Sequence, residues 1–368
     1  MNNGIFENGK EKKSGNQNAK REFSIIGFAC AILLIINYGG TAGILFLYRR
    51  LAESGALPSG LFAPGSASLL ILEAVLGYLI ALPAASLLVR KTISGTVPAG
   101  NAAGPLTASG FELFCIAFFL AFAGSAFGDL IEGWFAKTEG ISPSPVPDGA
   151  AGAVLYFVIL CILIPVSEEL FFRSVLGEAL IAYGDVPAIL IPALLSAFYH
   201  GNLTSFFVAF LEGMALGYVY VRTRRLIYPV LLRFALNLIA GFIPAVVVRW
   251  IGDIDALNEL MGKFAEAFQS LSASTEPFNA LLPELESSLS RIIVTELLNG
   301  LLAGIAFAGF ILFMSYFGKL RLSRGTRRLE GKEIGDTVFL APGIMLFLVL
   351  SITVIALSYS SFSADWFI

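Results

Sequence analysis

Long runs of apolar residues recur along the whole 368-residue chain, and they limit its possible folds more than any other feature. A helix needs about 20 apolar residues to cross a bilayer, and only helices and closed barrels satisfy their backbone hydrogen bonds there. About nine runs qualify, at residues 23–48, 67–89, 111–134, 151–182, 186–201, 203–221, 227–248, 292–317 and 338–359. The sequence therefore predicts an all-α fold, a polytopic integral membrane helix bundle with about nine transmembrane helices.

The composition of the chain points to the same class. Hydrophobic residues make up 57% of the chain and charged residues 14%, whereas about a quarter of the residues in soluble domains are charged. The net charge of −3 gives no basic surface for nucleic acid. The apolar composition makes the lipid bilayer the expected partner. All three cysteines fall within apolar runs, which favours small buried hydrophobes over a disulfide framework or a CxxC metal site.

Basic residues at the ends of the runs predict the orientation of the chain. Residues 1–22 are polar and basic, and we expect a disordered cytoplasmic tail there. The apolar run that follows exceeds the roughly 7–15 residues of a signal-peptide core, so we expect it to remain as the first span. Lys and Arg also gather at residues 90–91, 222–225 and 319–332, all on one side if the spans alternate. That side is predicted to be cytoplasmic, with Arg49 and Arg50 as exceptions.

An acidic segment separates the seventh and eighth runs. Residues 252–290 carry seven carboxylates against a single lysine, Lys263, on the predicted outer side. Apolar residues there recur at helical spacing, so we predict an acidic extracytoplasmic helical insertion at residues 249–291. A surface hairpin or cap is the simpler interpretation, and a role in substrate gating is the alternative. Residues 23–134 and 292–368 are predicted to form the N-terminal and C-terminal transmembrane helices.

Three charged residues stand within the fourth run, in the stretch PVSEELFFR. Glu169 and Arg173 are four residues apart on a helix, the spacing of a favourable ion pair. Glu168 lies about 100° around the helix from Glu169 and has no local partner. A desolvated carboxylate of this kind is a candidate general base.

Other polar residues are expected at a similar depth in the membrane. Gly184 lies midway between Glu168 and His200, the single histidine, and equal distances from a hairpin turn give equal depth. Arg233 and Asn237 share one face of the seventh run. The sequence therefore predicts that Glu168, His200, Arg233 and Asn237 converge on one polar pocket.

Each of these residues also has a simpler structural interpretation. Glu168, Glu169 and Arg173 can form an ion-pair cluster, His200 can cap a helix, and Arg233 can extend toward the cytoplasm. Asn237 can hydrogen-bond between helices. Because ionisable groups inside a membrane are functional by default, their predicted convergence favours a functional pocket.

These motifs resemble those of the CAAX-protease and bacteriocin-processing (CPBP, or Abi) family of intramembrane endopeptidases. Glu168, Glu169 and Arg173 match the family's EExxxR motif. The stretch SAFYH matches its FxxxH motif at His200, with Ser196 in place of Phe. The stretch RFALN matches its HxxxN motif at Asn237, with Arg233 in place of His. The resemblance covers residues 150–248 and implies a catalytic core there.

The resemblance also implies a mechanism and a substrate class. Glu168 would activate a water molecule with help from His200, and Arg233 and Asn237 would stabilise the oxyanion of a peptide bond under hydrolysis. Glu169 and Arg173 would form a structural ion pair. Zinc is possible by family analogy, but a zinc site normally needs three protein ligands, so with one histidine we expect no cofactor. The expected partner is a peptide or membrane-protein substrate, and the expected location is a bacterial plasma membrane crossed several times.

Two other functions remain open from the sequence. A catalytically inactive relative would act as a binding or bacteriocin-immunity module, and the replacements at Ser196 and Arg233 favour it. A small-solute transporter would also explain buried charges, but the chain lacks the paired, interrupted repeats of many transporters. A peptide-cleavage assay would distinguish the intramembrane endopeptidase from both alternatives.

Overall fold

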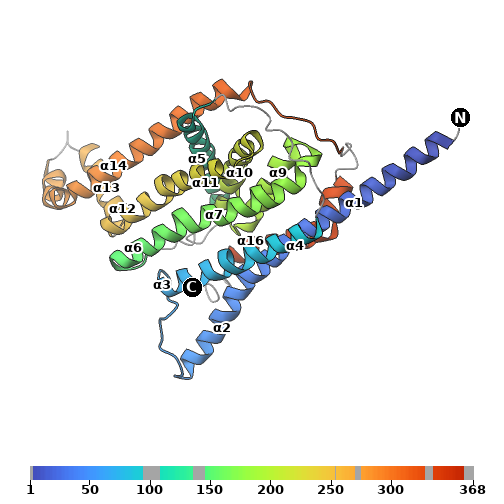
Figure 1. Cartoon of the computed structure of the whole chain (residues 1–368). Helices are drawn as coiled ribbons and strands as arrows, with labels where there is room; N and C mark the ends of the chain where they lie inside the picture. The colour runs from blue at the N-terminus through green and yellow to red at the C-terminus, as the bar shows by residue number, and fades with distance from the viewer. Residues whose placement is uncertain are drawn as a thin grey trace.

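The computed structural model describes residues 3–93, 108–135, 146–252, 254–269, 275–327 and 335–359. These ranges contain helices and connecting segments without a β-strand (Figure 1). The first apolar helix comprises α1 (Asn3–Leu34), the π-helical segment η1 (Ile35–Gly39) and α2 (Gly40–Glu53). The second comprises α3 (Ala67–Ala74), the π-helical η2 (Val75–Ala81) and α4 (Leu82–Thr92), and α5 (Gly110–Phe135) is the third.

The central part of the chain supplies four more apolar helices. The first of them is a continuous helix of six segments: α6 (Gly149–Phe157), η3 (Val158–Leu163), α7 (Ile164–Glu169), η4 (Leu170–Gly177), α8 (Glu178–Leu180) and the 3₁₀ turn η5 (Ile181–Tyr183). After it come α9 (Asp185–Tyr199) and α10 (Leu203–Thr223). The last is formed by α11 (Ile227–Leu236), the π-helical η6 (Asn237–Phe242) and α12 (Ile243–Ile251).

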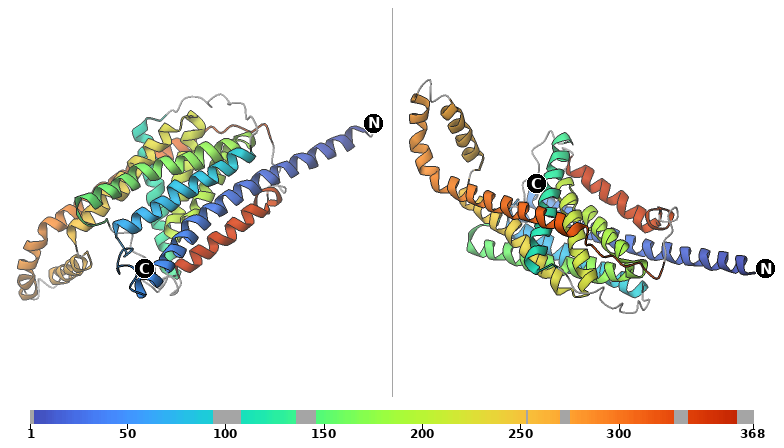
Figure 2. Two further views of the ribbon diagram at one scale, coloured as in Figure 1. Left: turned by 60° about the horizontal axis from the view of Figure 1, so that its bottom comes forward. Right: turned by 90° about the horizontal axis from the view of Figure 1, so that it is seen from above.

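The C-terminal part begins with the predicted acidic insertion. Helix α13 (Ile254–Gln269) packs against α14 (Glu276–Phe317), and Figure 2 shows this hairpin projecting at one end of the molecule. The π-helical η7 (Gly335–Phe339) and α16 (Pro342–Ser358) follow. The helical hairpin expected from the apolar periodicity is therefore present, and its predicted position outside the membrane stays a prediction.

Every predicted apolar run coincides with a helix. Within the described residues, 7 helices are long and apolar enough to cross a membrane. The two others, α9 and α16, have 15 and 17 residues, so at about 1.5 Å per residue they are shorter than the roughly 30 Å hydrocarbon core. The chain is thus a multi-pass membrane protein with an all-α bundle, as predicted, while the number of nine crossings stays a prediction.

Close helix contacts in the bundle depend on glycine. A Cβ atom at Gly124 of α5 would lie 2.7 Å from the carbonyl oxygen of Phe207 on α10, and one at Gly128 would lie 2.5 Å from the Cα of Thr204. On α10, a Cβ at Gly213 would lie 3.1 Å from the Cβ of Ala193 on α9. The small residues let α5 and α9 pack closely against α10, as expected for small residues at membrane helix interfaces.

The N-terminal helix packs against the C-terminal one. Helix α16 lies along α1 (Figures 1 and 2), and the side chains of Phe23 and Ile26 are fully buried in this region. Helical backbone begins at Asn3, which differs from the disorder predicted for residues 1–22. Contacts with the bundle begin before residue 23, because Ala19 is buried and Glu22 accepts hydrogen bonds from Tyr183 and Arg327.

Candidate functional site

The motif-bearing helix changes from α-helical to π-helical geometry directly after Glu169. Glu168, Glu169 and Arg173 are each at most 1% exposed. The Nε of Arg173 donates to Oε2 of Glu169 at 3.0 Å. This is the ion pair expected from the four-residue spacing, and both of its members lie inside the bundle.

Glu168 is paired with Arg233, which arrives from α11. The Nη2 of Arg233 lies 2.7 Å from Oε2 of Glu168, and its Nη1 lies 3.3 Å from Oε1 of Glu169. Arg233 is itself 5% exposed. Local sequence gave Glu168 no partner within its own helix, and the partner comes from α11 because α11 packs against α7.

Glu212 on α10 is a member of the cluster that motif reasoning missed. Its side chain is 6% exposed, and Oε1 lies 3.9 Å from Nε of Arg233. The signal was available in the sequence, because a carboxylate inside the apolar run 203–221 needs a partner or a role. We call the group Glu168, Glu169, Glu212, Arg173 and Arg233 the acidic cluster; it holds three carboxylates and two guanidinium groups.

His200 lies at the C-terminal end of α9 and has a hydrogen bond within its own helix. Its Nδ1 lies 2.7 Å from the carbonyl oxygen of Ser196. Because a carbonyl oxygen only accepts, Nδ1 is the donor in this hydrogen bond and Nε2 takes no part in it. Among the hydrogen bonds and ion pairs of the described residues, none joins His200 to Glu168.

Asn237 is the first residue of η6 and connects two helices. Its Nδ2 donates to the carbonyl oxygen of Leu160 in η3 at 2.8 Å. Asn237 lies one turn beyond Arg233 on the same helix, yet its described contact is with the backbone of the motif-bearing helix rather than with the cluster. This is the interhelical hydrogen bond that the simpler interpretation of Asn237 expected.

Helices near the N-terminus complete the surroundings of Glu168. The hydroxyl of Tyr78, in η2, donates to Oε1 of Glu168 at 3.5 Å. The hydroxyl of Tyr38 and the amide of Asn37, both in η1, donate to the backbone oxygen and the hydroxyl of Tyr199, each at 3.0 Å. These polar contributors all lie in π-helical segments, which are frequent at functional sites. Their signal in the sequence is a polar side chain within an apolar run.

A comparison with protein families identifies the segment that holds these motifs. Residues 150–239 match the family described as type II CAAX prenyl endopeptidase Rce1-like. This segment belongs to the Rce1-like family. The match confirms, at family level, the resemblance drawn from the three motifs. No curated protein and no solved structure matches the chain.

The Rce1-like segment spans α6 to η6 and contains the whole acidic cluster with His200 and Asn237. Membership indicates a peptide or membrane-protein substrate reached in the lipid bilayer. Tyr38 and Tyr78 lie outside the segment, so helices beyond the family match also build the surroundings of Glu168. Arg233, which replaces the motif histidine, places a permanent positive charge at the centre of the cluster.

The cluster retains hydrogen-bonding capacity that the described part of the chain does not use. Both Nη atoms of Arg173, Nε of Arg233 and Oε1 of Glu212 are buried without a hydrogen-bond partner there. Oε2 of Glu168 also lacks an aligned hydrogen bond, so its 2.7 Å contact with Arg233 is a charge contact. Buried polar groups are usually satisfied, and these atoms can bind a water molecule or a peptide group.

The donor set does not fit a zinc ion. No group of three or more His, Cys, Asp or Glu side chains among the described residues is arranged to hold a metal. Glu168 and Glu169 instead face guanidinium groups, whose positive charge would repel a cation. No step of a reaction is therefore assigned to a metal here.

Proposed function

We propose that this chain is an intramembrane endopeptidase of the CAAX-protease type, in which Glu168 activates the water that hydrolyses a peptide bond. The observation that carries the proposal is the acidic cluster inside the Rce1-like segment, with three carboxylates against two guanidinium groups. One carboxylate therefore exceeds the available positive charge. A buried carboxylate with uncompensated charge can take a proton from water, as a general base must.

The two oxygens of Glu168 differ in their contacts, which suggests which one acts. Arg233 holds Oε2 at 2.7 Å, while Tyr78 approaches Oε1 at the longer distance of 3.5 Å. Oε1 is thus the oxygen proposed to accept the proton as the water oxygen bonds to the peptide carbonyl carbon. The same proton then passes to the leaving nitrogen as the carbon–nitrogen bond breaks.

His200, Arg233 and Asn237 have supporting roles in this proposal. The protonated Nδ1 of His200 bonds to Ser196, so the unprotonated Nε2 can accept a hydrogen bond from the attacking water. Negative charge develops on the carbonyl oxygen, and donors aimed at that oxygen lower the barrier. Arg233 offers its Nε, which has an ion-pair contact with Glu212 but no hydrogen bond, and Asn237 offers the second hydrogen of its amide. Glu169 and Arg173 form a structural ion pair that stabilises the motif-bearing helix.

The site lies within helices that cross the bilayer, so the proposed substrate is a membrane-associated peptide or protein segment. We propose a bacterial plasma membrane as the location, with residues 1–22, 90–109, 222–226 and 318–336 on the cytoplasmic side. The acidic residues 249–291 are proposed to lie outside. Zinc plays no part in this proposal.

A second candidate function is favoured by one contact. Because Arg233 lies 2.7 Å from Glu168 and both side chains are almost fully buried, the guanidinium can hold Glu168 ionised and exclude water. In that case the chain is an inactive relative that acts as a binding or bacteriocin-immunity module.

Substitution of Arg233 separates the two candidates. The purified full chain is incubated with farnesylated CAAX peptides and with unmodified apolar peptides, and cleavage is followed by mass spectrometry. If Arg233 is an oxyanion donor, Arg233→Ala lowers turnover by about 10²–10³, and Arg233→His keeps or raises it. A wild-type chain without activity that gains activity on Arg233→His would contradict the peptidase proposal and favour the binding module.

A further inference from the structure

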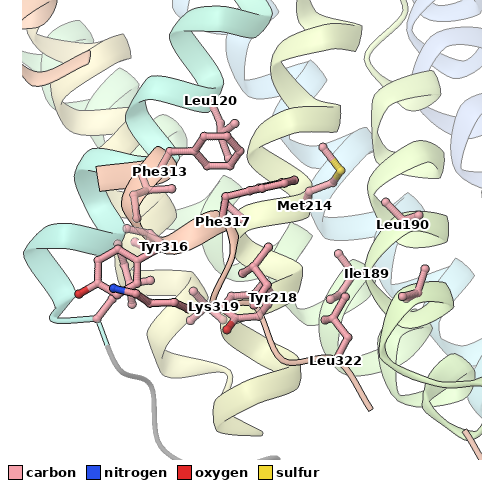
Figure 3. A pocket seen from close by; sticks show the side chains of 18 residues that line it. Leu120, Ile189, Leu190, Met214, Tyr218, Phe313, Tyr316, Phe317, Lys319 and Leu322 are labelled. Atoms are coloured by element: carbon pink, nitrogen blue, oxygen red, sulfur yellow. The ribbon is translucent and has the colours of Figure 1, made fainter. Parts of the chain in front are cut away.

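A cavity lies apart from the acidic cluster. Its volume is about 280 Å³, and its walls come from α5, α9, α10 and the C-terminal end of α14 (Figure 3). Leu120, Ile189, Met214 and Phe313 are typical of the walls, and no member of the acidic cluster lines it. Leu190, at 40% exposure, also lines it, so the cavity has an edge on the outside of the bundle. An apolar chain fits these walls.

The segment after α14 crosses one end of this cavity. We call residues 319–324 the basic strap, because it carries Lys319, Arg321 and Arg324. The strap is fixed to the start of α9 by two hydrogen bonds: the backbone N–H of Asp185 donates to the oxygen of Ser323 at 3.1 Å, and the N–H of Ser323 donates to Oδ2 of Asp185 at 2.7 Å. These two hydrogen bonds anchor the strap at Ser323 to the start of α9.

The side chains of the strap divide between the cavity and its outside. Leu320 and Leu322 line the cavity, while Arg321 between them is exposed and absent from the lining. This alternation is the one expected of extended backbone. The strap thus presents an apolar side to the cavity and a cationic side to its surroundings.

Lys319, the first residue of the basic strap, itself lines this end of the cavity. The Nζ of Lys319 lies 5.2 Å from the ring centre of Tyr316, and Figure 3 shows the two side chains together. The hydroxyl of Tyr316 donates to Glu112, which also accepts a hydrogen bond from the N–H of Ser109. No ion pair joins Lys319 to a carboxylate in the described residues, so its charge is available to an anion.

We infer that this cavity binds one acyl chain of an anionic phospholipid, whose phosphate is bound by Lys319 at the end that the basic strap crosses. An apolar cavity open at the bundle surface is accessible to lipid chains, and the cations at one end match the place of a headgroup. Basic pockets between membrane helices on the cytoplasmic side bind acidic headgroups. The inference does not depend on whether Glu168 is catalytic, because it concerns lipid binding alone.

Lipid binding to the purified full chain provides the test. Native mass spectrometry measures the affinity for phosphatidylglycerol and, separately, for phosphatidylcholine with the same chains. The wild type is expected to prefer the anionic lipid by about fivefold, the effect of about one surface cation. Lys319→Gln should abolish the preference, whereas Lys91→Gln, which removes an exposed lysine at the end of α4, should keep it.

A second variant tests the cavity itself. Leu190→Trp should fill it and weaken the binding of both lipids, whereas Leu87→Trp, at an exposed site on another helix, should not. Equal wild-type affinity for the two lipids would overturn the inference. So would a preference that survives Lys319→Gln, a site exposed enough for the variant to fold. Displacement of both lipids by a tighter-binding isoprenoid alcohol would instead assign the cavity to a prenyl chain.

Discussion

At the scale of single residues, Glu169 and Arg173 have the contacts of a structural pair. They are 3.0 Å apart and at most 1% exposed, and Glu169 also lies 3.3 Å from Arg233. Removing one partner of a buried ion pair costs about 3–5 kcal/mol, because the other charge is left uncompensated. Arg173→Ala should therefore lower the melting temperature of the purified protein strongly, and the double change Glu169→Gln with Arg173→Met should lower it less. An Arg173→Ala protein as stable as the wild type would contradict the structural assignment.

The spacing of residues along the sequence predicts contacts within one helix but not contacts between helices. The spacing of Glu169 and Arg173 predicts a pair that needs only one helix, and the structure contains it. Glu168 pairs with Arg233 across two helices, and the relative rotation of helices is not encoded in residue spacing. For the same reason, the equal spacing of Glu168 and His200 from Gly184 does not say what His200 contacts, and its described hydrogen bond is with Ser196 on its own helix.

At the scale of helices, the positions of the apolar runs could be predicted, and their π-helical segments could not. Apolar length is a local property, whereas a π-helical turn depends on packing against neighbouring helices. The glycines illustrate the packing: a Cβ at Gly124 would meet backbone atoms of α10, but one at Gly133 of the same helix would meet nothing within 4 Å. Gly124→Leu should therefore destabilise the protein by about 1–3 kcal/mol through overpacking, and Gly133→Leu should have little effect. Equal melting temperatures for the two variants would show that α5 does not pack against α10 in this way.

At the scale of the whole molecule, the distribution of basic residues predicts the orientation in the membrane. Residues 249–291 are predicted to lie outside. Ser272 in that segment is not among the described residues, so Ser290 on α14 is the better position for a probe of that side. A Ser290→Cys variant, in a chain whose three native cysteines are buried, should react with an impermeant thiol reagent on intact cells. A cysteine at Lys91 should react only after lysis. The opposite pattern would reverse the predicted topology.

Two glutamine variants on one helix decide whether Glu168 acts as the base of a peptidase site. Glu168→Gln keeps the size of the side chain but removes its basic carboxylate, so peptide cleavage should fall by at least about 10². Glu178→Gln is the matched control, because Glu178 belongs to the same continuous helix but bonds to Tyr220 and Arg224 outside the cluster. Peptide cleavage should be lost in Glu168→Gln and kept in Glu178→Gln, while both variants melt at the same temperature as the wild type. A folded Glu168→Gln protein that cleaves peptide as fast as the wild type would contradict the role of Glu168 as the base.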